Sequence, residues 1–169
     1  MYKCALLTEG VRKSAGWRKW RDTGQREGQI ELAIYHLSVK IVGRSSGRSA
    51  VAAAAYRAGE CITNDWDGVT HDFRKKHWIE YTEIMLPDHA PKSFKDRKTL
   101  WNAVEAAEKS KLAQLAREFE LALPKELSHQ QQIELLEKFV KQELISKGMC
   151  ADIAIHSPPK TNDRHQAID

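Results

Sequence analysis

The chain joins a predicted strand to a predicted helix through a turn that carries two arginines, and a tyrosine follows near the helix end. Arg44 and Arg48 flank this Gly/Ser turn, and Ser49 is a predicted helix N-cap. Tyr56 lies near the end of the alanine-rich helix. Backbone N–H groups at a helix start favour phosphate binding, and arginines strengthen it. A phenol just past such a site is suited to attacking a phosphodiester, although on spacing alone a structural tyrosine is the favoured interpretation.

Carboxylates and a histidine recur with a two-residue period in two later segments. Glu118 and Glu120 share one face of a predicted strand, and Asp152 and His156 share one face of the last predicted strand. Neighbouring strands of this kind would form a polar floor beneath the helix that carries Tyr56. Solvated strand faces are the alternative, and that alternative is favoured for Glu120 and Asp152.

These side chains are positioned by elements whose periodicity is readable. Alternating apolar residues predict strands, and apolar residues at spacings of three and four predict helices. The predicted order is strand 33–42, helix 49–59, a hairpin or loop 61–76, strand 78–86, helix 96–109, strand 116–124, helix 128–147 and strand 150–156. This order predicts an α+β fold with a central sheet.

Composition narrows the class of protein. The chain has 169 residues, of which 41% are hydrophobic and 30% charged, as in an ordinary globular domain. Its net charge of +4 permits binding to a polyanion without demanding it. No apolar run is long enough for a membrane helix or a signal core, so a cytoplasmic protein is expected. The three cysteines lie far apart, which predicts reduced thiols rather than disulfides or a zinc site.

Several segments, in the same order, resemble one known family. AIYHLSVKIVGRSSGRSAVAAAAYRAGE is similar to the N-terminal part of the MobA/MobL plasmid mobilisation relaxases. The likeness continues through DGVTHDFRKK, YTEIMLP, DRKTLWNAVEAAEK, QLAREFELALPKEL and GMCADIAIH, so it covers residues 33–156. The resemblance implies an HUH relaxase-like fold, with a central antiparallel β-sheet that is flanked by helices and incomplete at its C-terminal end.

The resemblance also implies a chemistry and a partner. Tyr56 would be the nucleophile that attacks single-stranded DNA, His156 would be the first of three metal-binding histidines, and Glu118 would orient a metal-binding histidine or assist proton transfer. The expected cofactor is a divalent cation, Mg²⁺ or Mn²⁺. The expected partners are single-stranded or supercoiled plasmid DNA at a transfer origin and accessory mobilisation proteins, with no membrane. Candidate DNA-binding residues are Lys40, Arg44, Arg48 and Arg57.

The chain departs from the family pattern in one respect. The family continues into an Asn-Pro-His-x-His strand that supplies the other two histidine ligands, and no His-x-His occurs in this sequence. His165 resembles a loop residue rather than a substitute ligand. That strand would lie beside the strand of His156, so an open sheet edge is expected there. The sequence is therefore expected to be an N-terminal fragment that keeps the nucleophile and some DNA binding, holds metal weakly or not at all, and cleaves poorly.

Three segments are predicted along the chain. Residues 1–31 form a basic extension, interpreted as a flexible DNA-binding arm, as a short helix docked by its tryptophans, or as a mis-assigned start; disorder is expected there. Residues 33–156 form the truncated relaxase-like domain, and 157–169 form a polar tail or loop. Trp66 and Trp78 are candidates for stacking on unpaired bases, with core packing favoured for Trp78.

Other functions remain open. The chain is alternatively a non-catalytic DNA-binding regulator of the transfer origin, or an HUH-type replication initiator. A protein-interaction adaptor built on the amphipathic helix 128–147 rests only on a stripe that is more often core.

Overall fold

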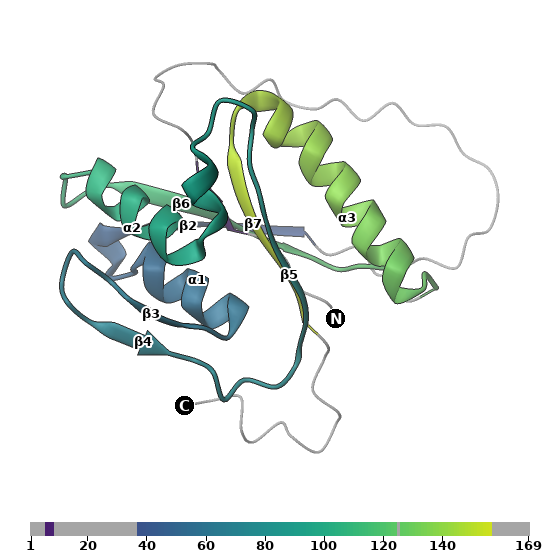
Figure 1. Ribbon diagram of the computed structural model, residues 1–169, viewed down its shortest axis with the longest axis horizontal. Helices are drawn as coiled ribbons and strands as arrows, with labels where there is room; N and C mark the ends of the chain where they lie inside the picture. Colours follow the sequence, from purple (N-terminus) through teal and green to yellow (C-terminus); the bar gives the residue numbers. More distant parts are fainter. Residues whose placement is uncertain (1–5, 9–36, 125, 157–169) are drawn as a thin grey trace.

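The computed structural model describes residues 6–8, 37–124 and 126–156. In this part of the chain a five-stranded sheet in the order β2-β6-β1-β7-β5 separates two helical layers (Figure 1). Every neighbouring pair in the sheet is antiparallel. The α+β class and the antiparallel sheet are therefore confirmed. The strands are β1 Leu6–Thr8, β2 Leu37–Gly43, β5 Ile79–Met85, β6 Gln114–Leu121 and β7 Cys150–His156.

The helices begin where their N-cap residues predict. The helix α1 spans Ala50–Ala58, α2 spans Arg97–Ala107 and α3 spans His129–Glu143. Side chains of Ser49 and Asp96 accept from backbone N–H groups of α1 and α2, and Ser128 forms a reciprocal capping box with Gln131. The α1 helix ends at Gly59, whose φ of 65° is the left-handed conformation that favours glycine. Short 3₁₀ turns lie at Arg44–Ser46, Lys92–Lys95 and Ile145–Lys147.

The two helical layers enclose two different cores. On one face, α1, α2 and the hairpin of β3 (Cys61–Thr63) and β4 (Thr70–Asp72) pack around residues such as Val51, Leu100 and Trp101. On the other face, α3 packs against Ile153 and Ile155 of β7. The predicted alternation of β7 is therefore confirmed, with Asp152 and His156 on the face of α1 and α2.

The helix α2 is anchored to β7 by a buried ion pair. Asp152 accepts from Arg97 Nε and Nη2 at 2.8 and 2.9 Å, and from Trp101 Nε1 at 2.8 Å. Burial disfavours the charged guanidinium, yet Asp152 and Glu60 raise the pKa of Arg97 above its ordinary value. The prediction that Asp152 is solvated is wrong, because this carboxylate is 4% exposed and joins sheet to helix.

The apolar side chains of the edge strand β2 are more exposed than the alternation of this strand predicts. Its alternation does form a strand, but Leu37, Val39 and Ile41 are 48%, 51% and 49% exposed. The reason is position, because β2 lies at the edge of the sheet and the buried residues of the α3 core come from α3, β5 and β7. The first four residues of the predicted strand, 33–36, lie outside the described residues.

The short strand β1 lies in the middle of the sheet. Its residues Leu6 and Leu7 pair with β6 on one side and with β7 on the other. The sheet edge that was expected to be open beside β7 is therefore paired at Cys150, Ala151 and Asp152. The remainder of the predicted extension 1–31, and the predicted tail 157–169, lie outside the described residues.

Candidate functional site

The predicted nucleophile lies in the last turn of α1 with its side chain at the surface. Tyr56 is 51% exposed. Its ring meets the edge of Phe73, with ring centroids 5.2 Å apart, and Lys76 Nζ lies 3.5 Å from the ring centroid. The same ammonium group donates to the backbone oxygen of Tyr56 at 3.0 Å. The segment that follows β4 therefore orients the phenol while leaving about half of it open to solvent.

A neighbouring arginine connects three predicted site residues. Arg57 follows Tyr56 on α1, and its guanidinium forms an ion pair with Glu118 of β6. Its backbone oxygen accepts a hydrogen bond from His156 Nε2 at 2.8 Å. Arg57 thus contacts both Glu118 of β6 and His156 of β7, although β1 lies between these two strands in the sheet. The Tyr56 ring contacts Phe73 and Lys76 instead, so a shared site of the three residues stays a prediction.

Glu118 is the buried acid of this cluster. It is 7% exposed and accepts from Arg48 Nη2 at 2.7 Å as well as from Arg57. Its contact with the histidine strand is indirect and runs through Arg57. The geometry supports an orienting role through the arginine, and the predicted catalytic role stays a prediction. Lys40 lies opposite Glu118 in the strand register, but its Nζ pairs with Glu120 at 3.5 Å.

His156 has one nitrogen engaged with the protein backbone. A carbonyl oxygen only accepts, so in the neutral imidazole Nε2 carries the proton toward Arg57 and Nδ1 carries the lone pair. A divalent cation needs several such donors. Among the described residues no group of three His, Cys, Asp or Glu side chains could hold a metal ion. The donors in this part of the chain do not make up a catalytic metal site by themselves.

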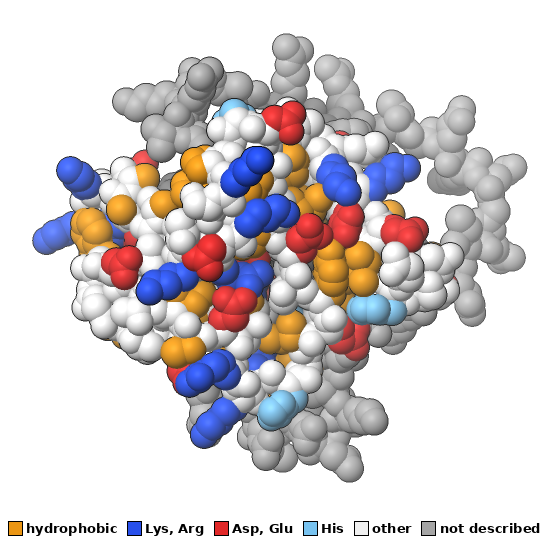
Figure 2. All heavy atoms as spheres, in the orientation of Figure 1, with side chains coloured by type: hydrophobic (Ala, Val, Ile, Leu, Met, Phe, Trp, Pro, Cys, Tyr) orange, Lys and Arg blue, Asp and Glu red, His pale blue; other side chains and the backbone are white. Residues whose placement is uncertain are grey.

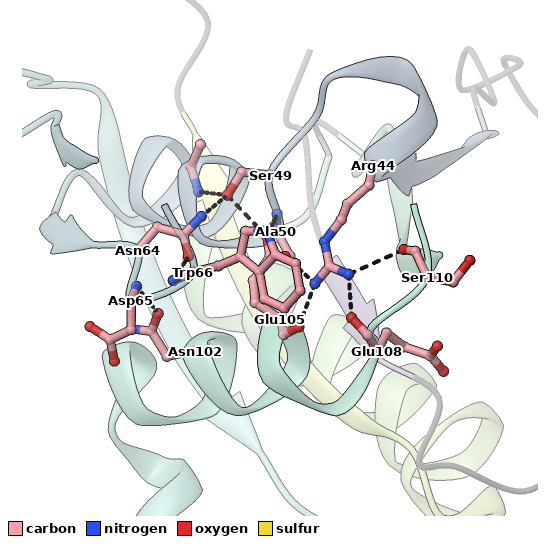
Figure 3. A network of polar contacts seen from close by, with 11 residues as sticks. Arg44, Ser49, Ala50, Asn64, Asp65, Trp66, Asn102, Glu105, Glu108 and Ser110 are labelled. Atoms are coloured by element: carbon pink, nitrogen blue, oxygen red, sulfur yellow. Dashed lines mark hydrogen bonds and ion pairs between the residues drawn. The ribbon is translucent and has the colours of Figure 1, made fainter. Parts of the chain in front are cut away.

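The other end of α1 carries a second polar cluster (Figure 3). Glu105 of α2 is 2% exposed, and its Oε1 accepts from the backbone N of Ala50 at 2.8 Å and from Ser49 Oγ at 3.1 Å. Its Oε2 accepts from Arg44 Nη2 at 3.0 Å. The guanidinium of Arg44 also donates to backbone oxygens near the end of α2, at Glu105, Glu108 and Ser110.

This second cluster changes the interpretation of the helix start. The sequence predicts that N–H groups of α1 and the two arginines are open to a phosphate. In the structure a carboxylate of the protein itself, Glu105, occupies the place of that anion. Arg44 is held by α2, and Arg48, whose side chain is 39% exposed, is paired with Glu118. The phosphate contacts predicted for these two arginines stay predictions, and the structure gives both a structural partner.

Sequence reasoning missed Glu105, Arg97 and Lys76. The first two had a readable signal, because Arg97, Trp101 and Glu105 recur every four residues along the apolar stripe of α2. A charged residue on a buried stripe requires a buried partner. Lys76 lies in a loop, where spacing carries no such information. His36, in the predicted strand 33–42, lies outside the described residues.

A second tyrosine shows how a structural phenol differs. Tyr81 of β5 donates toward Glu83 Oε2 and Glu137 Oε1, at 2.6 and 2.8 Å. Burial and these two carboxylates raise the pKa of Tyr81 above its ordinary value, which keeps it a neutral phenol. Tyr81 is thus a useful internal reference for Tyr56.

The surface charge is mixed. In the view of Figure 2, basic and acidic side chains are interspersed, and neither sign dominates this face. Within the described part of the chain, no helix is both long and apolar enough to cross a membrane.

Comparisons with known proteins agree with one another. The model of the MobA/MobL family matches residues 48–168. The mobilization protein MobL of Acidithiobacillus ferridurans is 42% identical over 79% of this chain and 34% of its own length. The conjugal transfer protein TraA of Rhizobium radiobacter is 41% identical over 76% of this chain and 12% of its own length. The chain thus spans about a third or less of these two relatives.

A solved structure supports the same relationship at the level of the fold. It is described as "Molecular Basis of Vancomycin Resistance Transfer in Staphylococcus aureus" and is 29% identical in sequence. It superposes with a TM-score of 0.62 and covers 77% of this chain and 74% of its own.

Proposed function

Because this chain belongs to the MobA/MobL family of mobilisation proteins, we propose that it carries the nucleophile end of a DNA relaxase. The proposed substrate is single-stranded DNA at a plasmid transfer origin, presented by supercoiled plasmid in the cytoplasm. Accessory mobilisation proteins are the proposed further partners. The observation that supports the proposal most is the half-exposed Tyr56 in the same turn of α1 that receives Glu118 and His156.

The proposed reaction is a transesterification. The phenol oxygen of Tyr56 attacks a phosphodiester phosphorus, the bond from phosphorus to the 3′-oxygen breaks, and the 5′-phosphate remains on the tyrosine. The phenol gives up its proton, and the departing 3′-oxygen takes one up to become a free hydroxyl. The covalent bond conserves the energy needed to rejoin the strand later.

The arginines and Glu118 would prepare this turn for a phosphate. Arg48 and Arg57 both pair with the single carboxylate of Glu118. Arginines beside the nucleophile are suited to binding the substrate phosphate. Glu118 holds Arg57 in place, and the Arg57 backbone in turn receives His156.

Relaxases of this family generally use a divalent cation, which polarises the scissile phosphate when it is bound. Among the described residues no group of three His, Cys, Asp or Glu side chains could hold such a cation, and the sequence has no His-x-His. We therefore expect this chain by itself to bind DNA and to cleave it weakly. A non-catalytic DNA-binding fragment is the second candidate function, and it is favoured by the same sparse donor set.

The test separates the nucleophile from the binding function. The DNA that flanks the gene is offered as supercoiled plasmid and as labelled single strands, with Mg²⁺ or Mn²⁺ and long incubation. Covalent protein–DNA adducts are then sought on denaturing gels and by mass spectrometry. We expect a low adduct yield from the wild type and from Tyr81→Phe, and none from Tyr56→Phe.

The possible results distinguish a relaxase from a non-catalytic DNA-binding fragment. Adduct that persists at wild-type yield in Tyr56→Phe would contradict the assignment of the nucleophile. DNA binding by all three proteins without adduct in any of them would favour the non-catalytic fragment. Rapid, metal-dependent cleavage by the wild type would overturn the expectation of weak activity.

A further inference from the structure

Trp66 combines high exposure with a rigid support. It lies in the loop between β3 and β4, and 52% of its surface is exposed. Large aromatic side chains at such exposure gain little from burial and are enriched where proteins bind partners. Contacts of its loop and of Arg44 hold this ring at the surface.

The loop of Trp66 is held by two asparagines. Asn64 is 1% exposed, and its Oδ1 accepts from the Trp66 backbone N at 3.0 Å while its Nδ2 donates to Ser49 Oγ at 3.3 Å. Asn102 of α2 accepts from the Asp65 backbone N at 2.8 Å and donates to the Thr63 backbone oxygen at 3.0 Å. The loop is thereby fastened to both α1 and α2 (Figure 3).

The ring itself is backed by a cation on one face. The guanidinium carbon of Arg44 lies 4.0 Å from the Trp66 ring centroid. Arg44 cannot follow a moving ring, because Glu105, Glu108 and Ser110 hold its guanidinium. One face of Trp66 is thus occupied by a fixed cation, and the residue is nevertheless 52% exposed.

The charges around Trp66 are arranged on two sides. Lys109 and Lys111 flank Ser110, whose backbone oxygen accepts from Arg44 at 3.2 Å, and both lysines are exposed. Asp65 and Asp67 lie in the loop of Trp66 itself and are also exposed. Phosphates are therefore favoured on the side of the α2–β6 connection and disfavoured on the side of the β3–β4 loop.

From this arrangement we propose that Trp66 is a stacking platform for one unpaired base of single-stranded DNA, with Lys109 and Lys111 contacting the neighbouring phosphates. Proteins that bind single-stranded DNA without reading its sequence commonly stack the bases on aromatic side chains that lie beside cationic ones. The proposal rests on the proposed relaxase function and adds a subsite to it.

The loop of Trp66 and the side chain of Tyr56 belong to opposite ends of α1. The loop of Trp66 is tied through Asn64 to Ser49 at the start of α1, and Tyr56 lies in its last turn. From Ala50 to Tyr56 the helix rises about 9 Å.

A structural role is the competing explanation. Trp66 would then only shield the ion pair of Arg44 and Glu105 from water, and any apolar side chain of similar size would serve. Trp66→Leu separates the two roles, because leucine still covers the ion pair but has no π-face. Val69→Ala is the matched control, since Val69 is a 47% exposed apolar residue of the same loop.

The experiment measures binding by fluorescence anisotropy with two labelled probes of equal length. One is a short oligothymidine, and the other is an abasic strand with the same phosphates and no bases. We expect Trp66→Leu to bind oligothymidine about 5- to 100-fold more weakly than the wild type and to bind the abasic strand equally well. Trp66→Phe should fall between, and it replaces the leucine variant if that variant does not fold. Val69→Ala should match the wild type on both probes.

Each other result overturns the platform. If the wild type binds oligothymidine and Trp66→Leu binds it equally, the platform is wrong while the relaxase proposal stands. Equal losses on both probes would mean that Trp66 supports the fold or the phosphate contacts and not a base. If the wild type binds neither probe, DNA binding itself fails and the platform fails with it.

Discussion

The two ends of α1 use the same kinds of residue in opposite ways. At the N-terminal end, Arg44, Ser49 and the first N–H group of the helix all converge on Glu105, which is 2% exposed. At the C-terminal end, Arg57 also holds a buried glutamate, yet the adjacent Tyr56 is half exposed. One end is closed by the protein itself, and the other presents a reactive group to solvent.

This difference shows where an anion can still bind. A helix N-terminus beside arginines is the usual phosphate site, but here an internal carboxylate already satisfies it. At the other end of the helix, Arg48 and Arg57 share the carboxylate of Glu118, and among the described residues no carboxylate is shown to occupy a place beside Tyr56. A substrate phosphate is therefore expected at the end of α1 that lacks the usual helix-start signal.

Removing the carboxylate of Glu105 should lower the free energy of unfolding more than the other substitutions at either end of α1. Glu105→Ala leaves Arg44 without its carboxylate partner and the Ala50 N–H without its acceptor, so we expect the free energy of unfolding to fall by about 3–5 kcal/mol. Urea denaturation measures this loss. Added sulfate should raise the melting temperature of the variant more than that of the wild type, because the emptied place is an anion site.

The control for this change is the neighbouring acid. Glu108 contributes only its backbone oxygen to Arg44, so Glu108→Ala should change the free energy of unfolding by less than about 0.5 kcal/mol. Equal losses in the two variants, or no selective effect of sulfate, would show that Glu105 does not fill an anion site.

The corresponding substitution at the C-terminal end of α1 is Glu118→Gln. It should lower the free energy of unfolding less than Glu105→Ala does and change DNA binding more. Glu118→Gln keeps one acceptor oxygen for Arg48 and Arg57 but removes the negative charge, and we expect a loss of about 1–3 kcal/mol. The uncompensated arginines should bind single-stranded DNA more tightly, with a steeper dependence on salt. Any adduct yield should fall, because the turn that carries Tyr56 is held less firmly.

Glu120 provides the comparison for Glu118. It lies on the same face of β6, and its ion pair with Lys40 is long, at 3.5 Å, with the Lys40 side chain 52% exposed. Glu120→Gln should therefore cost less than about 1 kcal/mol and change the salt dependence of DNA binding less than Glu118→Gln does. If the two glutamine variants behave alike, the cluster at the open end has no special role.

Much of the framework could be predicted because its signals are local. Alternation in 116–124 identified β6, which spans Gln114–Leu121, despite residues that favour a helix, and Ser49 and Ser128 marked helix starts that the structure reproduces. The helix predicted for 128–147 ends earlier, at Glu143. These features depend on a few consecutive residues. Pattern and caps therefore determine which elements form and where they begin.

The partners of the charged residues could not be predicted in the same way. Glu105 lies 55 residues from Ala50, and Asp152 lies 55 residues from Arg97 in sequence. Only the packing of α2 against α1 and β7 brings these pairs together. The same limitation applies to β2, whose apolar stripe predicts a covered face but says nothing of which strand lies at the sheet edge. For the candidate site, the family resemblance named Tyr56 and His156, and the packing supplied Arg57 as their link.

Apart from the two controls, the smallest change in the free energy of unfolding should come from substitutions at Ser49, the N-cap of α1, and the sign of that change tests the comparison of the two helix ends. Ser49→Ala removes an acceptor for the Ala52 N–H and a donor to Glu105, and should cost about 1 kcal/mol. At an ordinary N-cap, aspartate serves as well as serine. Here it would place a second carboxylate beside Glu105, so Ser49→Asp should be at least as destabilising as Ser49→Ala. Ser128→Asp, at the capping box of α3, should be nearly neutral. Thermal denaturation of the three variants measures these differences in stability. A stabilising Ser49→Asp would mean that the start of α1 is still open to an anion.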